Sequence, residues 1–143
     1  MARYKATVRS PWPAEKAFAF MADLRNFEKW DPNVDHSKLV SGDAPGPDAV
    51  YEVKVMAAEL CYKTCEYDHP NRAVVEARTR LLYTRDVIEV TPTDTGCDVL
   101  YDATFEVNGL LGSVVNPVVM LFFNRIGDKA AAGMETALDG QKI

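Results

Sequence analysis

The chain has 143 residues, of which 48% are hydrophobic and 26% charged, a composition typical of one globular domain with a sizeable core. Its formal net charge is -5, and its Lys and Arg residues are scattered, which argues against a nucleic-acid partner. Three cysteines (Cys61, Cys65 and Cys97) lack disulfide-framework spacing, which predicts buried, reduced thiols and a cytoplasmic location.

The first thirty residues predict a strand followed by two short helices. Residues 3–9 alternate between polar and apolar side chains, as in a half-buried strand that ends at Ser10-Pro11. Pro13 stands where a helix can begin, because its missing N–H costs nothing in the first turn. Apolar residues then recur at helical spacing up to Leu24. The segment RNFEKW predicts a second short helix that Asp31-Pro32 stops.

Strand patterns dominate residues 33–107. The segments SGDAPGPD, DHPN and DTG are turn signals that separate apolar stretches, and turn signals recur about every ten residues. No helical spacing lies between them, so we expect an antiparallel meander of six strands after the helices. The last of these strands has the clearest apolar face, formed by Val99, Tyr101, Ala103, Phe105 and Val107.

Residues 111–138 predict one long helix. At 100° per residue, a stripe about 60° wide should face the sheet; it contains Val115, Val119, Phe122, Ile126, Ala130, Gly133 and Ala137. Asn116-Pro117 predicts a kink or a helix start, with Leu110–Val115 as a separate turn.

The first half of this helix is apolar nearly all round, so it needs a cover. A membrane span is not expected, because the apolar run is shorter than about 20 residues and is interrupted by Pro117. Either a cavity or a contact surface then accounts for it. Homodimerisation or contact with a membrane surface is the expectation for the outward residues, which include Val114, Met120, Leu121 and Phe123.

Particular segments carry a resemblance to a known superfamily. SPWPAEKAFAFMADLRNFEKWDPNV, CEYDHPNRAVVEARTR and the long C-terminal helix resemble the START-like superfamily, also called SRPBCC or Bet v 1-like, which includes polyketide cyclases and dehydratases. The resemblance covers essentially the whole chain and implies a single domain over residues 1–143. The implied α+β architecture is a helix-grip fold. In it, a seven-stranded antiparallel sheet wraps around the long C-terminal helix, two short helices follow the first strand, and a cavity lies between sheet and helix.

The expected cavity wall combines inward strand residues with the apolar half of the helix. Asp86 shares strand parity with Ile88 and Val90, so it faces the cavity if they do, and a buried carboxyl suits acid–base chemistry. Alternatively, Asp86 lies at the sheet rim or pairs with Arg85 or another arginine. The other predicted wall residues are Phe27 near the mouth, Tyr51, Val53, Tyr101, Phe105, Val118, Val119 and Phe122.

Two functions remain open at this level. One is non-catalytic binding of a hydrophobic molecule (a lipid, a quinone or a polyketide-like compound). The other is cyclisation or dehydration with Asp86 and the tyrosines as acid–base groups. The pattern favours the binder slightly, because only Asp86 and two tyrosines are both polar and predicted to face inward. We expect no cofactor and no metal site, since His36 and His69 are far apart in sequence and have no Cys or acidic partners at ligand spacing.

Overall fold

The computed structural model describes the backbone of residues 1–143 and every side chain except those of residues 110, 111 and 113–116. Predictions for the side chains of Val114 and Val115 therefore fall outside the described residues, whereas the separate turn expected over Leu110–Val115 is wrong because this backbone is part of one long helix. The long helix, α3, spans Gly109–Ala137 with Pro117 inside it, so the helix does not begin at Asn116-Pro117.

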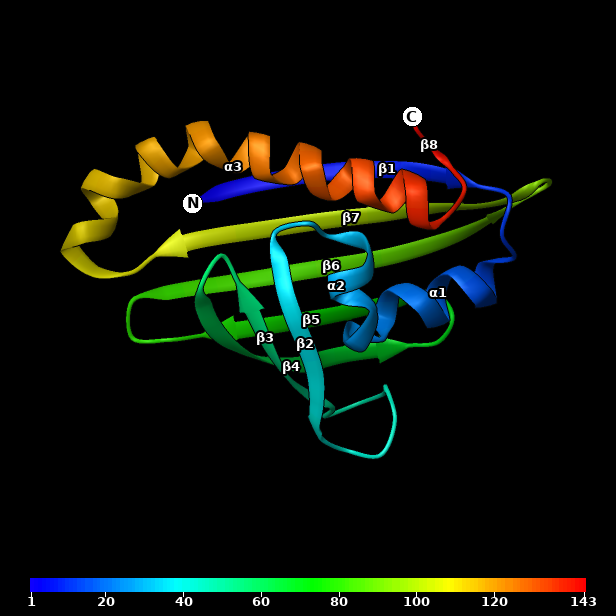
Figure 1. Ribbon diagram of the computed structural model, residues 1–143, viewed down its shortest axis with the longest axis horizontal. Coiled ribbons are helices and arrows are strands. Elements are labelled where there is room, and N and C mark those ends of the chain that lie inside the picture. The colour runs from blue at the N-terminus through cyan, green and yellow to red at the C-terminus, as the bar shows by residue number, and fades with distance from the viewer.

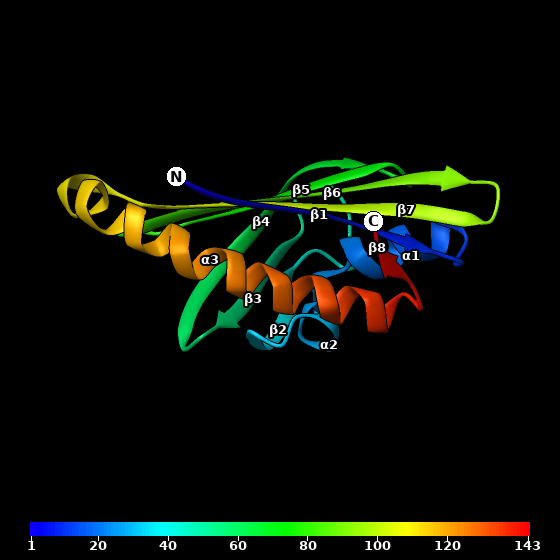
Figure 2. The ribbon, with the colours of Figure 1, turned by 90° about the horizontal axis from the view of Figure 1, so that it is seen from above.

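The described chain forms one antiparallel sheet in the order β2-β3-β4-β5-β6-β7-β1-β8, with the helices on one face (Figures 1 and 2). Six strands form a meander, and the first strand joins beside the last of these. The elements are β1 (Ala2–Ser10), α1 (Ala14–Ala22), the 3-10 helix η1 (Leu24–Asn26), α2 (Phe27–Trp30), β2 (Val34–Ser41), β3 (Val50–Val55), β4 (Ala58–Asp68), β5 (Arg72–Arg78), β6 (Leu82–Thr93), β7 (Gly96–Val107), α3 and β8 (Gln141–Lys142).

The helix-grip architecture predicted from the sequence is confirmed, but the sheet has eight strands and not the predicted seven. This extra strand, β8, is only two residues long and pairs with Val8 and Arg9 of β1. Two residues cannot show an alternation, so no sequence pattern could reveal it. None of the described residues belongs to a helix that is long and apolar enough to cross a membrane.

Side-chain parity changes within β4. Leu60, Tyr62 and Thr64 are buried on the concave face, but a register shift between Thr64 and Glu66 interrupts the pairing with β5. An extra residue of this kind is a β-bulge, and it moves the following side chains to the other face. The half-buried Tyr67 therefore packs on the same core although it lies three residues after Thr64.

The cysteine prediction is correct for one residue of three. Cys97 in β7 is fully buried, whereas Cys61 and Cys65 of β4 are exposed. Cys61 alternates with inward neighbours and so faces outward, and Cys65 lies at the bulge. The position of each cysteine in its strand, and not its apolar character, determines which face of the sheet its side chain occupies.

The predicted stripe of α3 faces the sheet in the first half of the helix, through Val119, Phe122 and Ile126, but the buried face is rotated from it in the second half. Among the described side chains of that stripe, only Ala130 is buried, and Ala131 and Met134 beside it are buried too. Two glycines set this rotation: Gly127 lies against the ring of Tyr4, and Gly133 against the backbone carbonyl of Trp30. A side chain at either position would prevent the close approach. Helix α3 is therefore held between β1 and α2, and the rest of the predicted stripe is only partly covered.

Candidate functional site

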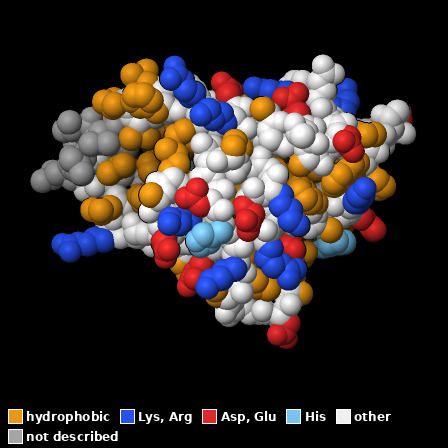
Figure 3. All heavy atoms as spheres, in the orientation of Figure 1, with side chains coloured by type: hydrophobic (Ala, Val, Ile, Leu, Met, Phe, Trp, Pro, Cys, Tyr) orange, Lys and Arg blue, Asp and Glu red, His pale blue; other side chains and the backbone are white. Residues whose placement is uncertain are grey.

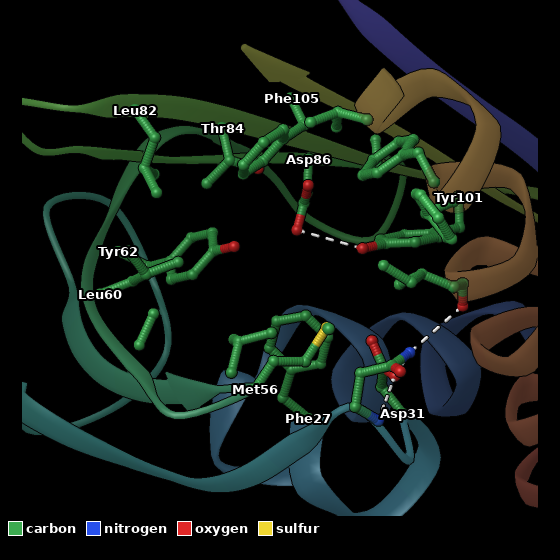
Figure 4. A pocket seen from close by; sticks show the side chains of 18 of the residues that line it. Phe27, Asp31, Met56, Leu60, Tyr62, Leu82, Thr84, Asp86, Tyr101 and Phe105 are labelled. Atoms are coloured by element: carbon green, nitrogen blue, oxygen red, sulfur yellow. Dashed lines mark hydrogen bonds between the residues drawn. The ribbon is translucent and has the colours of Figure 1, made fainter. Parts of the chain in front are cut away.

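An apolar cavity of about 380 Å³ lies between the concave face of the sheet and the first half of α3 (Figure 4). This volume is within the range of small-molecule sites. Residues from α2, the β3–β4 hairpin, β6, β7 and α3 contribute to it. The described residues that line it are Phe27, Asp31, Asn33, Val55, Met56, Ala58, Leu60, Tyr62, Leu82, Thr84, Asp86, Tyr101, Ala103, Phe105, Val118, Val119, Phe122, Phe123 and Ile126.

Most of the predicted wall residues lie in this lining, and two do not. Phe27, Tyr101, Phe105, Val118, Val119, Phe122 and Asp86 line the cavity. Tyr51 and Val53 are instead fully buried in the core of β3. Tyr51 lies beneath η1, close to Asp23 and the backbone of Leu24, and burial raises its pKa to about 12. Alternation assigned both side chains to the correct face of the sheet, but it could not show how far along that face the cavity extends.

Asp86 lies in the polar part of the cavity, in the strand position that its parity predicts. It is 3% exposed and shares the inner face of β6 with Ile88 and Val90, which are also buried. The hydroxyl of Tyr101 on the neighbouring strand β7 donates a hydrogen bond of 3.1 Å to Asp86 Oδ2 (Figure 4). Arg85 does not pair with Asp86, since its Nε lies 3.4 Å from Glu76 Oε1.

Burial changes the acidity of this pair. Desolvation raises the pKa of Asp86 from 3.8 to about 7, and the hydrogen bond from Tyr101 opposes only part of that effect. The carboxylates of Asp31 and Asp102 raise the pKa of Asp86 further. Burial and the proximity of Asp86 raise the pKa of the Tyr101 phenol well above 10. At neutral pH, Asp86 is therefore divided between its two protonation states beside a neutral phenol.

Two more polar side chains face the same space. The Tyr62 hydroxyl points toward Asp86 from the opposite wall, and Thr84 lies next to Asp86 on β6 (Figure 4). Desolvation is the main cause that raises the pKa of Tyr62 well above 10, so this phenol also stays neutral. The Thr84 hydroxyl donates a hydrogen bond of 3.0 Å to the backbone oxygen of Thr104.

Asp31, at the end of α2, is the second carboxyl group of the cavity. Its Oδ1 accepts hydrogen bonds from the Asn33 backbone N at 2.9 Å and from Asn33 Nδ2 at 2.8 Å. Asn33 Nδ2 also donates to the backbone oxygen of Ile126, at 3.2 Å, which connects this turn to α3. Burial raises the pKa of Asp31, and the hydrogen bonds from Asn33 lower it in part.

Several residues of the cavity wall are not predicted by the sequence pattern. Tyr62 and Leu60 alternate clearly at the start of β4, but the bulge at Cys65 hides the pattern when the whole strand is considered. Asp31 and Asn33 follow the short helix, where Asp-Pro signals only a stop. No local signal shows that this turn faces the cavity, because the sheet and α3 bring it there.

Trp30 packs against the inner face of the sheet. Its ring stacks on Phe27, with centroids 4.9 Å apart, and meets Tyr101 edge-on at 5.2 Å. Both neighbours line the cavity, so Trp30 supports the wall from behind.

The first half of α3 leaves apolar side chains in solvent. Val118, Met120, Leu121 and Phe122 are between 48% and 77% exposed, and Figure 3 shows hydrophobic side chains gathered over this part of the molecule. Phe123, predicted to face outward, is instead half-buried and stacks on Phe105 with centroids 5.9 Å apart. The homodimer contact stays a prediction, which sedimentation velocity of the wild type and of Leu121→Gln would test.

Among the described residues, no group of three His, Cys, Asp or Glu side chains is placed to hold a metal ion. The polar groups that the described residues bring to the cavity are the carboxyl groups of Asp31 and Asp86, the phenols of Tyr62 and Tyr101, the Thr84 hydroxyl and the Asn33 amide.

Comparisons with known proteins agree with this architecture. Residues 1–139 match the model of the family described as polyketide cyclase / dehydrase and lipid transport. The sequence matches no curated protein. A START superfamily protein from Mycobacterium smegmatis is 13% identical with a TM-score of 0.74, and the match covers 97% of this chain and 98% of that one.

Two other solved structures are similar over most of their length. A hypothetical protein from Helicobacter pylori is 10% identical with a TM-score of 0.76, and the match covers 96% of this chain and 86% of that one. The protein Ara h 8.0201 is 19% identical with a TM-score of 0.61, covering 94% and 97% of the two chains. At these identities the likeness shows the fold alone.

Proposed function

This chain belongs to the polyketide cyclase / dehydrase and lipid transport family, and from that membership we propose that it binds a hydrophobic small molecule in the cavity between sheet and α3. The observation that carries the proposal is a space of about 380 Å³ in which apolar side chains surround one buried polar cluster. Such a space suits a ligand with an apolar body and a polar end. Lipids, quinones and polyketide-like compounds all have this form.

The cavity wall has a buried polar part and an apolar part on the side of α3, and this division supports the proposal. Asp31, Tyr62, Asp86 and Tyr101 are each at most 6% exposed, and all four line the cavity. The α3 side of the cavity is apolar and includes partly exposed residues such as Phe122, which is 57% exposed. A ligand would therefore enter past α3 and place its polar end against Asp86 and Tyr101. Three reduced cysteines are consistent with action in the cytoplasm.

Native mass spectrometry of the protein purified from its own host, followed by extraction of any bound molecule, would identify the ligand. Titration with the neutral fluorescent probe N-phenyl-1-naphthylamine provides an independent measurement of binding. We expect saturable binding that Ala103→Phe or Val119→Trp abolishes, because either change fills the cavity. Leu121→Gln is the matched control, since Leu121 is 77% exposed and outside the lining. Probe binding that survives both filling changes in folded protein would contradict the proposal.

Acid–base catalysis is the second candidate, and the Asp86–Tyr101 pair favours it. A carboxyl group with a pKa of about 7 can accept and return a proton at neutral pH. In a dehydration, the Asp86 carboxylate would take the proton from a carbon beside a carbonyl. It would then return that proton to the departing hydroxyl group, so that water leaves and the carboxylate is restored.

The two candidates differ in what happens to the extracted ligand. A dehydratase releases a product that is lighter than the ligand by one water. A cyclase releases a product with a different chromatographic retention, whereas a carrier releases the ligand unchanged. Asp86→Asn should abolish such turnover while binding of N-phenyl-1-naphthylamine persists. Turnover that is equal in the wild type and in Asp86→Asn would exclude Asp86 as the catalytic residue.

A further inference from the structure

The two charged side chains that the described residues bring to the cavity wall are both acidic. Asp31 and Asp86 both line the cavity and are 6% and 3% exposed, so little solvent screens them. Their mutual repulsion is one of the causes that raise the pKa of Asp86. The fold therefore holds two acidic groups close enough to influence each other, in a mostly apolar space.

No basic side chain offsets them. None of the described residues that line the cavity is Lys, Arg or His. The six residues whose side chains are not described are Leu, Ser, Val and Asn, so they cannot supply a positive charge either. Arg125, the first basic residue after them along α3, is exposed.

Two arginines of β6 and β1 pair with acidic residues away from the cavity. Arg85 follows strand parity to the outer face, where it meets Glu76. Arg3 pairs with Asp102 at 2.7 Å, also on the outer face of the sheet. Asp31 and Asp86 therefore have no basic partner among the described residues of the cavity wall.

We propose that the polar end of the ligand is a hydrogen-bond donor without negative charge, a hydroxyl or an amine, and that the cavity excludes carboxylate and phosphate ends. This inference rests on the proposed function and narrows its ligand class. A hydroxyl or ammonium can donate to Asp86 or Asp31, whereas an anionic end would meet these two acids and no basic side chain among the described lining residues. Free fatty acids and lipid phosphates are therefore poor ligands.

A matched series with one chain length tests the inference. At pH 8, above the pKa of Asp86, decanol, decylamine and decanoate are compared as competitors of N-phenyl-1-naphthylamine, each below its micelle concentration. We expect decanol and decylamine to compete at least tenfold more tightly than decanoate. Decanoate competing within tenfold of decanol would overturn the inference and leave the proposed function standing. If calorimetry detects no binding of the probe or of any of the three compounds, the inference and the proposed function are both refuted.

Asp86→Asn should increase the affinity for decanoate, a change that misfolding would not produce. This change removes one negative charge but keeps a similar shape, so the affinity for decanoate should rise at least threefold relative to that for decanol. Asp98→Asn is the control, because Asp98 lies on the outer face of β7 and pairs with Arg9 at 2.9 Å. The ratio should not change in that variant. An equal ratio in the wild type and Asp86→Asn would show that the carboxylate does not select the ligand.

Discussion

The buried carboxyl of Asp86 should make the protein less stable as the pH rises. In the unfolded chain its pKa is near 3.8, and in the folded protein it is about 7. Between these values the folded state keeps a proton that the unfolded state releases, so the free energy of unfolding falls with increasing pH. A tenfold change in proton affinity is worth about 1.4 kcal/mol, so the whole effect is about 4 kcal/mol.

Asp86→Asn removes this titration and retains an oxygen that can accept the Tyr101 hydrogen bond. From pH 5 to pH 8, the variant should become about 3 kcal/mol more stable relative to the wild type, because most of the titration falls in that interval. Three of the groups near Asp86 keep one charge state over this interval, and Asp31, whose repulsion raises the pKa of Asp86, is present in both proteins. Tyr62 and Tyr101 stay neutral because their pKa values are raised well above 10, and Arg3 keeps Asp102 ionised.

Urea unfolding of both proteins at pH 5, 6, 7 and 8 measures the difference. Asp98→Asn is the matched control: Arg9 lowers the pKa of Asp98, so its titration lies below this pH range and its difference from the wild type should stay constant. A wild-type to Asp86→Asn difference that changes by less than about 1 kcal/mol between pH 5 and 8 would refute the raised pKa. It would also remove the main support for acid–base catalysis.

Three further predictions test the coupling of Asp31 to Asp86, the packing of α3 and the burial of the cysteines. Asp31→Asn should lower the pKa of Asp86, measured from its carboxyl carbon by NMR; an unchanged or higher midpoint would show that the two acids do not interact. Gly133→Ala should cost about 2 kcal/mol or more in urea unfolding because the new methyl group meets the Trp30 backbone, whereas Gly46→Ala, with nothing nearby, should stay within about 0.5 kcal/mol. A thiol reagent should modify the two cysteines of β4 rapidly and the one in β7 only on unfolding; three equal rates would contradict their burial.

Sequence periodicity alone determined the order of elements and the inward face of most strands. Alternation placed Asp86, Tyr101 and Phe105 on the inner face, because each side chain of a regular strand points opposite to the one before it. The turns at DHPN and DTG separate strands as predicted, since their backbone shapes suit few residue types. These are local properties, and the chain encodes them within a few residues.

Tertiary structure alone decided where the cavity opens and what charge its wall carries. Asp31 and Asn33 reach the cavity only because α2 packs against α3, and Tyr51 is excluded because η1 covers it. The rotation of α3 depends on Gly127 and Gly133 meeting other elements, which no helical wheel contains. Whether an inward side chain becomes core or cavity wall depends on what lies opposite, and that partner comes from distant parts of the chain.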